Sequence, residues 1–180
     1  MDRIQTLRAG TLILAFAQLL VILVAVEFFL LPDLFTLSLF LLAVLLLVGY
    51  FFLLLGFDDR AGYVGALLFF IAFFLLLLNL QRIIEFARGL FAFHPVQTAE
   101  FLPLLLIPLL YVASNALVGI GFYNLGKKYN SNTLKIAGSL LGASIAADLV
   151  AGEVAPFLAV FSFFLAYIGL SEISKRSFAG

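Results

Sequence analysis

The chain has 180 residues, of which 65% are hydrophobic and only 11% are charged, and its ten basic and ten acidic residues give a formal net charge of zero. So few charged residues leave too little polar surface to coat a soluble globule of this length, which excludes a soluble domain. The absence of cysteine from the sequence also excludes disulfides, thiolate metal sites and cysteine nucleophiles. We therefore expect an integral membrane protein that is surrounded by the lipid bilayer and has no nucleic acid as a partner.

Apolar runs long enough to cross a bilayer follow one another along the chain. A helix needs roughly 20 apolar residues to span about 30 Å of hydrocarbon. Four runs meet this length: Thr11 to Leu31, Leu34 to Phe57, Ala61 to Leu80 and Phe101 to Phe122. Two further runs, Leu134 to Val150 and Val154 to Leu170, have about 17 residues each, so they form either two short spans or a re-entrant pair. The sequence thus predicts an all-α, polytopic membrane bundle of six transmembrane helices.

Short connections between the runs predict a single integral membrane domain over residues 1–180. Asp58 and Asp59 precede Arg60 in one of these turns and are expected to cap the third span. The longest connection follows that span. Within residues 81–94, polar side chains such as Arg82 and Glu85 recur on one helical face and apolar side chains on the other, which predicts an amphipathic helix lying along the membrane interface.

The lysines and arginines orient the predicted bundle, because basic residues in short loops are retained on the cytoplasmic side. With six spans, eight of the ten fall on the side of the chain termini, and only Arg82 and Arg88 fall on the other. The eight are Arg3, Arg8, Arg60, Lys127, Lys128, Lys135, Lys175 and Arg176. A re-entrant last pair would leave both termini on this same side. We expect a multi-pass protein of the plasma membrane with both termini in the cytoplasm.

Small residues in the fifth run predict where helices pack closely. Gly138, Gly142 and Ala146 form a GxxxGxxxA face, and helices in lipid associate through close backbone approach at such residues. We expect this helix to be central in the bundle. The same face favours assembly with another membrane protein or with further copies of the chain.

Ionisable residues near or within the apolar runs are the candidates for chemistry, because a charge there costs free energy and tends to have a reason. Asp148 lies in the small-residue helix, and Glu27, Glu153 and Arg82 approach the same outer level. One interpretation is an outward-facing polar cavity that binds an ion or a small solute. The other is a set of interfacial carboxylates that reach water and pair with arginines.

Catalytic and metal-binding patterns are missing from the sequence. His94 is the only histidine, so no bis-histidine haem site, histidine zinc motif or Ser-His-Asp triad can form. We expect no enzymatic activity, no cofactor and no metal. Lys127, Lys128 and Tyr129 instead indicate an anchor to anionic lipid headgroups.

The stretch Phe-Tyr-Asn-Leu-Gly-Lys-Lys-Tyr-Asn at residues 122–130, followed by Leu-Lys-Ile-Ala-Gly at 134–138, resembles uncharacterised archaeal multi-pass membrane protein families. The resemblance covers about 20 residues and implies no activity.

Two functions stay open. The favoured one is a non-enzymatic accessory or structural subunit of a membrane assembly; the alternative is a small transporter or channel that uses the outward-facing polar cavity. An intramembrane enzyme is the least favoured, for want of a base or nucleophile.

Overall fold

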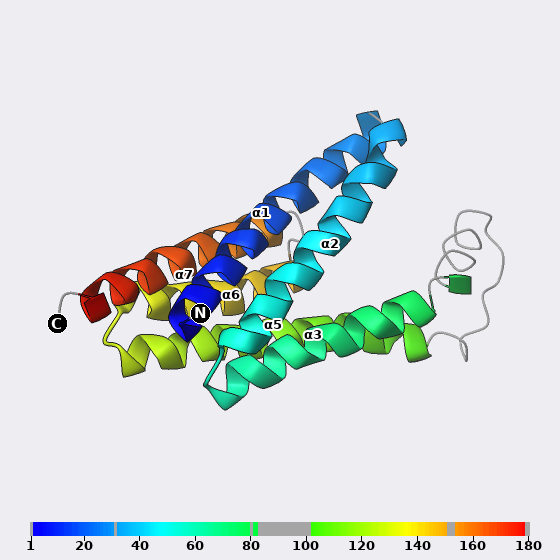
Figure 1. Cartoon of the computed structure of the whole chain (residues 1–180). Helices are drawn as coiled ribbons and strands as arrows, with labels where there is room; N and C mark the ends of the chain where they lie inside the picture. The colour runs from blue at the N-terminus through cyan, green and yellow to red at the C-terminus, as the bar shows by residue number, and fades with distance from the viewer. Residues whose placement is uncertain (1, 31, 80, 83–101, 151–153, 179–180) are drawn as a thin grey trace.

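A computed structural model describes residues 2–30, 32–79, 81–82, 102–150 and 154–178, apart from the side chains of 25–36, 102–105, 149, 177 and 178. These residues form six α-helices and no strand, which confirms the all-α class (Figure 1). The helices are α1 (Arg3–Leu30), α2 (Pro32–Gly56), α3 (Arg60–Leu78), α5 (Leu102–Lys128), α6 (Asn132–Val150) and α7 (Ala155–Phe178). Residues 83–94 of the predicted interfacial segment lie outside the described part of the chain.

Five of these helices contain a described stretch long and apolar enough to cross a membrane. The stretches are Arg3–Val24, Leu37–Gly56, Arg60–Leu78, Leu106–Lys128 and Ala155–Arg176. The last of them has 22 residues and is therefore longer than the predicted run of about 17. A crossing by α6, which has 19 residues, stays a prediction.

The six helices close into a ring in which each packs mainly against two others. Going round the ring, the neighbours are α1–α2, α2–α3, α3–α5, α5–α6, α6–α7 and α7–α1, and the lightest contact is between α2 and α3. Consistent with this, the α1–α2 pair and the α3–α5 pair diverge away from the end of the bundle where the chain begins (Figure 1). The expectation that α6 is central is wrong, because its main contacts are with α5 and α7 alone.

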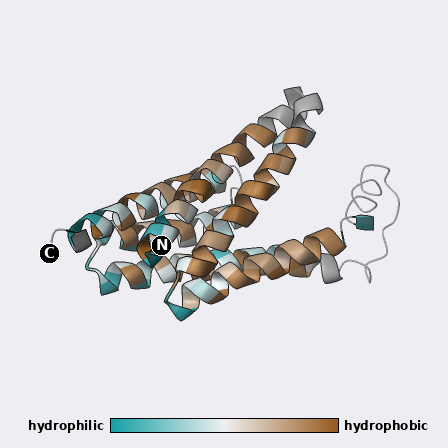
Figure 2. Cartoon of the chain, viewed as in Figure 1, coloured by the Kyte–Doolittle hydropathy of each residue, from teal (hydrophilic) through white to brown (hydrophobic). Residues whose placement is uncertain are grey.

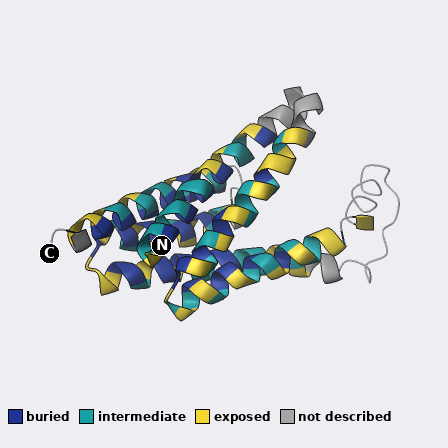
Figure 3. Cartoon of the chain, in the orientation of Figure 1, coloured by how far each residue is buried: buried dark blue, intermediate teal, exposed yellow. Residues whose placement is uncertain are grey.

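Apolar side chains from all six described helices fill one core inside the ring. The largest fully buried ones include Tyr50, Phe122, Phe163, Leu14 and Leu134. Exposed positions recur along α2 and α3 (Figure 3), where large apolar residues such as Phe40 and Phe74 face outward. An outer surface of leucine and phenylalanine is typical of helices that face lipid.

Glycines bring α5 into backbone contact with both of its neighbours. A Cβ on Gly119 would lie 2.9 Å from the carbonyl oxygen of Gly138 on α6, and a Cβ on Gly121 would lie 2.6 Å from the Cα of Gly62 on α3. Real Cβ contacts are longer than this, so both crossings require glycine. Close approach at small residues is the interaction by which helices pack in lipid, since hydrophobic burial gains little there.

Candidate functional site at the polar end of the bundle

Charged residues gather at the end of the bundle where α1, α3 and α6 begin and α2, α5 and α7 end (Figure 2). All eight basic residues that the sequence assigns to one side lie on these helix ends. The helices continue beyond the predicted apolar runs here: α1 begins at Arg3, and α5 ends at Lys128. The first turn of α1 and the last turn of α5 therefore hold charged residues that lie outside the apolar part of each helix. We call this region the polar end.

The turn between α2 and α3 supplies two of the acids of this end, Asp58 and Asp59. Asp59 caps α3, because its Oδ2 accepts hydrogen bonds from the backbone N–H groups of Ala61 at 3.0 Å and Gly62 at 3.1 Å. Its Oδ1 accepts a 3.1 Å hydrogen bond from the side-chain Nδ2 of Asn124 on α5. The predicted cap of the third span is therefore confirmed at Asp59, and the same carboxylate also fastens α3 to α5.

Asp58, the other acid of the turn, pairs with two bases from different helices. Its carboxylate accepts a hydrogen bond from the guanidinium of Arg3 on α1, and its Oδ2 lies 3.7 Å from the Nζ of Lys128 on α5. More than half of the surface of each of these side chains is exposed, so each pair contributes between about 0 and 1 kcal/mol and weakens in salt. We call Arg3, Asp58, Asp59, Asn124 and Lys128 the polar latch, because they join α1, α3 and α5.

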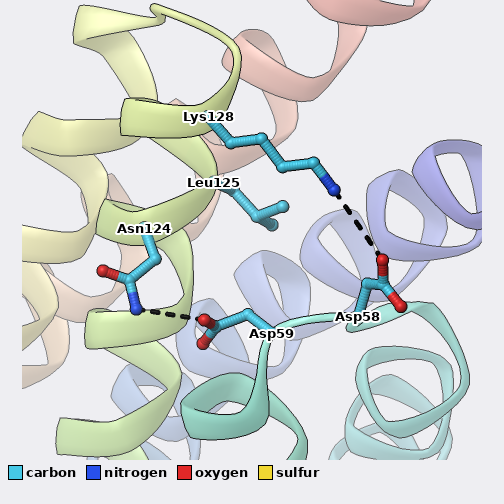
Figure 4. A pocket seen from close by; sticks show the side chains of 5 residues that line it. All are labelled: Asp58, Asp59, Asn124, Leu125 and Lys128. Carbon is cyan, nitrogen blue, oxygen red and sulfur yellow. Dashed lines mark hydrogen bonds and ion pairs between the residues drawn. The ribbon is translucent and has the colours of Figure 1, made fainter.

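A hollow of about 300 Å³ opens at the latch (Figure 4). The residues that line it are Asp58, Asp59, Asn124, Leu125 and Lys128. Figure 4 shows the Lys128 ammonium and the Asn124 amide reaching toward one aspartate each. The charged and amide groups of this hollow are thus paired with one another, which suits a structural junction better than a site that binds a charged ligand.

Tyrosine rings lie close to the two lysines at the end of α5. The Nζ of Lys127 lies 4.8 Å from the ring centre of Tyr123, and the Nζ of Lys128 lies 5.5 Å from that of Tyr129. These distances are within the range of cation–π attraction. The three residues of the predicted headgroup anchor, Lys127, Lys128 and Tyr129, are exposed at the end of α5, and their contact with headgroups stays a prediction.

The residues predicted to form an outer ion or solute site are not brought together by any described contact. Asp148 is exposed on α6, and Arg82 is exposed just beyond the end of α3. No ion pair between these two residues occurs in the part of the chain that the structure describes. Glu27 lies in α1 with its side chain outside that part, and Glu153 lies outside it altogether.

The three small residues predicted to pack α6 have different surroundings. Gly138 faces α5, where an added Cβ would overlap the carbonyl oxygen of Gly119. Gly142 faces away from the chain, since nothing lies within 4 Å of the position that its Cβ would take. Ala146 is exposed on the same side. One residue of the face thus packs α6 within the chain, and the other two lie on its outer surface.

A buried polar contact was not foreseen from the sequence. The hydroxyl of Tyr50 on α2 donates a 2.6 Å hydrogen bond to the Oδ1 of Asn115 on α5. The signal available in the sequence was the amide of Asn115 in the middle of an apolar run, because such a group needs a partner when it is removed from water.

Two comparisons with known proteins give no match, either among curated proteins or among solved structures. A third comparison, with protein families, matches residues 17–178 to the model described as "Protein of unknown function (DUF973)". Because this match covers most of the sequence, including at least part of all six described helices, the chain belongs to that family.

Proposed function

We propose that this chain is a non-enzymatic, multi-pass membrane protein that acts as a small accessory or structural subunit of a membrane assembly. The observation that carries the proposal is the outer face of α6. Four small residues are exposed there: Ser139, Gly142, Ala143 and Ala146. The partner that covers this face is another membrane protein or a further copy of the chain.

The physical argument compares this face with the rest of the outer surface. On α2 and α3 the exposed positions carry large apolar residues; Phe40 is 70% exposed and Phe74 is 59% exposed. Such residues interact well with lipid chains, whereas a small-residue face gains most when a second helix approaches its backbone. Between Ile136 and Val150, which are exposed large residues, the exposed positions that the structure describes on α6 carry only the four small residues and Asp148. This middle part of the outer face therefore differs from the surface of α2 and α3 in the way expected of a helix–helix interface.

The expected orientation is part of the proposal. Eight of the ten basic residues belong to the polar end, and in membrane proteins such an excess lies on the cytoplasmic side. We therefore assign the polar end, with both chain termini, to the cytoplasmic face of the plasma membrane. An archaeal source for the chain likewise remains a proposal.

The experiment that tests the accessory role enlarges the α6 face without disturbing the fold. Gly142→Leu adds a side chain where a Cβ meets nothing in the chain. The matched control is Val48→Leu, which enlarges an exposed position on α2. Cross-linking in native membranes, followed by mass determination, should show one stoichiometric complex that the control retains and that Gly142→Leu loses. If Gly142→Leu leaves the complex intact, or no complex forms with the unmodified chain, the proposed role is wrong.

A small transporter or channel is the second candidate, and Asp148 is the observation that favours it. An acid within a helix of small and apolar residues is costly in a membrane and often serves an ion or a solute. Asp148→Asn tests this role in proteoliposomes. Loss of flux with the protein folded would support the transporter, and unchanged flux would remove the residue on which it depends.

A further inference from the structure

The two adjacent lysines at the end of α5 have different neighbours. The Nζ of Lys128 lies 3.7 Å from the Oδ2 of Asp58, on the side of the latch. Lys127 forms no ion pair with any carboxylate that the structure describes, and its Nζ lies 4.8 Å from the ring centre of Tyr123. Successive residues of a helix are rotated by about 100° from one another. Lys128 thus lies beside the Asp58 carboxylate, whereas the ammonium of Lys127 lies on another side of α5, over the Tyr123 ring.

The crossing of α5 and α6 places a second lysine, Lys135, against Gly126, the residue before Lys127. A Cβ on Gly126 would lie 2.8 Å from the Cγ of Lys135, so the stem of Lys135 packs against the residue that precedes Lys127. One turn along, a Cβ on Gly138 would lie 3.1 Å from the Cβ of Tyr123. Lys135 and Tyr123 thus belong to the same α5–α6 crossing, and Lys127 reaches it through the Tyr123 ring. We call these three residues the basic crossing.

The charge of Lys135 is also unmatched by an acid. Its Nζ donates a 3.4 Å hydrogen bond to the Oδ1 of Asn132, a neutral amide, and Lys135 forms no ion pair with a carboxylate whose side chain the structure describes. Tyr123 is 38% exposed, and Ile120, one turn deeper along α5, is 48% exposed. The basic crossing therefore combines two positive charges, an interfacial tyrosine and an outward apolar residue on the membrane side.

We propose that the basic crossing binds the headgroup phosphate of an anionic phospholipid, with the acyl chains running along α5 past Ile120. The lysine ammonium groups donate charge-assisted hydrogen bonds to the phosphate oxygens, and the ring of Tyr123 holds Lys127 at the level of the headgroups. The proposal depends on the chain lying in a membrane and is independent of the accessory role. It assigns the headgroup contact to Lys127 and Lys135, whereas Lys128 belongs to the polar latch.

The experiment measures binding of phosphatidylglycerol to the purified full chain by native mass spectrometry. Each basic residue near an anionic surface strengthens binding about fivefold, so the double variant K127Q/K135Q should bind about thirtyfold more weakly. The matched control K175Q/R176Q removes two charges from the end of α7 at the same end of the bundle, and it should weaken binding less than about threefold. K127R/K135R, which keeps both charges, should retain the lipid.

Three results would overturn the proposal. Equal weakening in the two charge-removing double variants would show that only net charge matters, and unchanged binding in K127Q/K135Q would show that the crossing does not hold the lipid. Displacement of phosphatidylglycerol by inorganic phosphate as effectively as by more of the lipid would identify a site for a soluble anion. Should K127Q/K135Q fail to fold, the single variant K127Q, with an expected fivefold loss, decides the same question.

Discussion

The hydroxyl of Tyr50 on α2 and the side-chain oxygen of Asn115 on α5 form a 2.6 Å hydrogen bond between two buried residues. The Tyr50 ring stacks on Phe69 of α3, with ring centres 3.8 Å apart and planes within 3°. The Nδ2 of Asn115 donates to the carbonyl oxygen of Tyr111 at 3.2 Å, so both ends of the amide have partners. The hydrogen bond connects α2 to α5, which are not neighbours in the ring, while the stacked Phe69 belongs to α3 between them.

Removal of the Tyr50 hydroxyl should lower the free energy of unfolding. In Tyr50→Phe, the Oδ1 of Asn115 loses its donor while staying buried, and we expect a cost of about 1–2 kcal/mol. A double-mutant cycle with Asn115→Leu isolates the interaction, measured by unfolding of the purified protein in mixed micelles. Additive effects of the two substitutions would contradict the coupling.

Two glycines of α6 that lie one turn apart should respond oppositely to alanine. Gly138→Ala places a methyl group against the carbonyl oxygen of Gly119 and should destabilise the protein by about 1–3 kcal/mol, because the helices must separate. Gly142→Ala meets no atom within 4 Å and should be neutral or stabilise by up to about 1 kcal/mol, since alanine favours the helix. Thermal unfolding of both variants measures the difference. Equal effects would mean that the α5–α6 crossing is not held at backbone contact.

The cap of α3 is expected to contribute more than the neighbouring ion pairs. Asp59→Ala removes an N-cap that accepts two backbone hydrogen bonds, together with the bond from Asn124, and should cost about 1–2 kcal/mol. Asp59→Asn is the informative control, because an asparagine oxygen can still cap the helix. The Asn variant should recover most of the loss in the free energy of unfolding, and failure to do so would assign the effect to charge.

The pairs of Asp58 should matter little and depend on ionic strength. Asp58→Asn removes the attraction to Arg3 and Lys128, whose side chains are largely exposed, so the expected loss is below about 1 kcal/mol. The difference between this variant and the unmodified chain should shrink as salt is raised from low to about 1 M, because the Debye length falls to about 3 Å. A loss that is large or independent of salt would show that Asp58 acts through something other than exposed ion pairs.

Much of the fold could be predicted from the sequence, because length and hydropathy alone define helices in a membrane. The first apolar run, Thr11 to Leu31, marks α1 to within one residue at its C-terminal end, yet the helix begins eight residues earlier, at Arg3. Hydropathy cannot show where the helix begins. A charged residue ends an apolar run, but the helix can continue through charged residues into water. The clustering of basic residues at one end was also predictable, because the number of apolar runs determines on which side of the bundle each connection lies.

Neighbour relations between helices were harder to predict. Gly138 and Gly142 belong to the same GxxxG pattern in the sequence, but Gly138 packs on α5 and Gly142 faces outward. Crossed helices are in close contact only near the crossing point, so a side chain one turn further along α6 would no longer face α5. Hydropathy also could not show that Asn115 meets Tyr50, 65 positions away in the chain. Adjacent Lys127 and Lys128 read as one anchor in the sequence, and only the positions of Asp58 and Tyr123 distinguish them.

The two glycines of α5 have a mechanical consequence for the whole ring. Gly119 and Gly121 hold the backbone of α5 against α6 on one side and against α3 on the other. With no side chain between the backbones, neither neighbour can tilt or slide far without moving α5 as well, so α3, α5 and α6 form a stiff plate. The seam between α2 and α3 has the lightest packing in the ring. A change in membrane thickness or lateral pressure would therefore be taken up first at that seam, as a change in the angle between the α1–α2 pair and the plate.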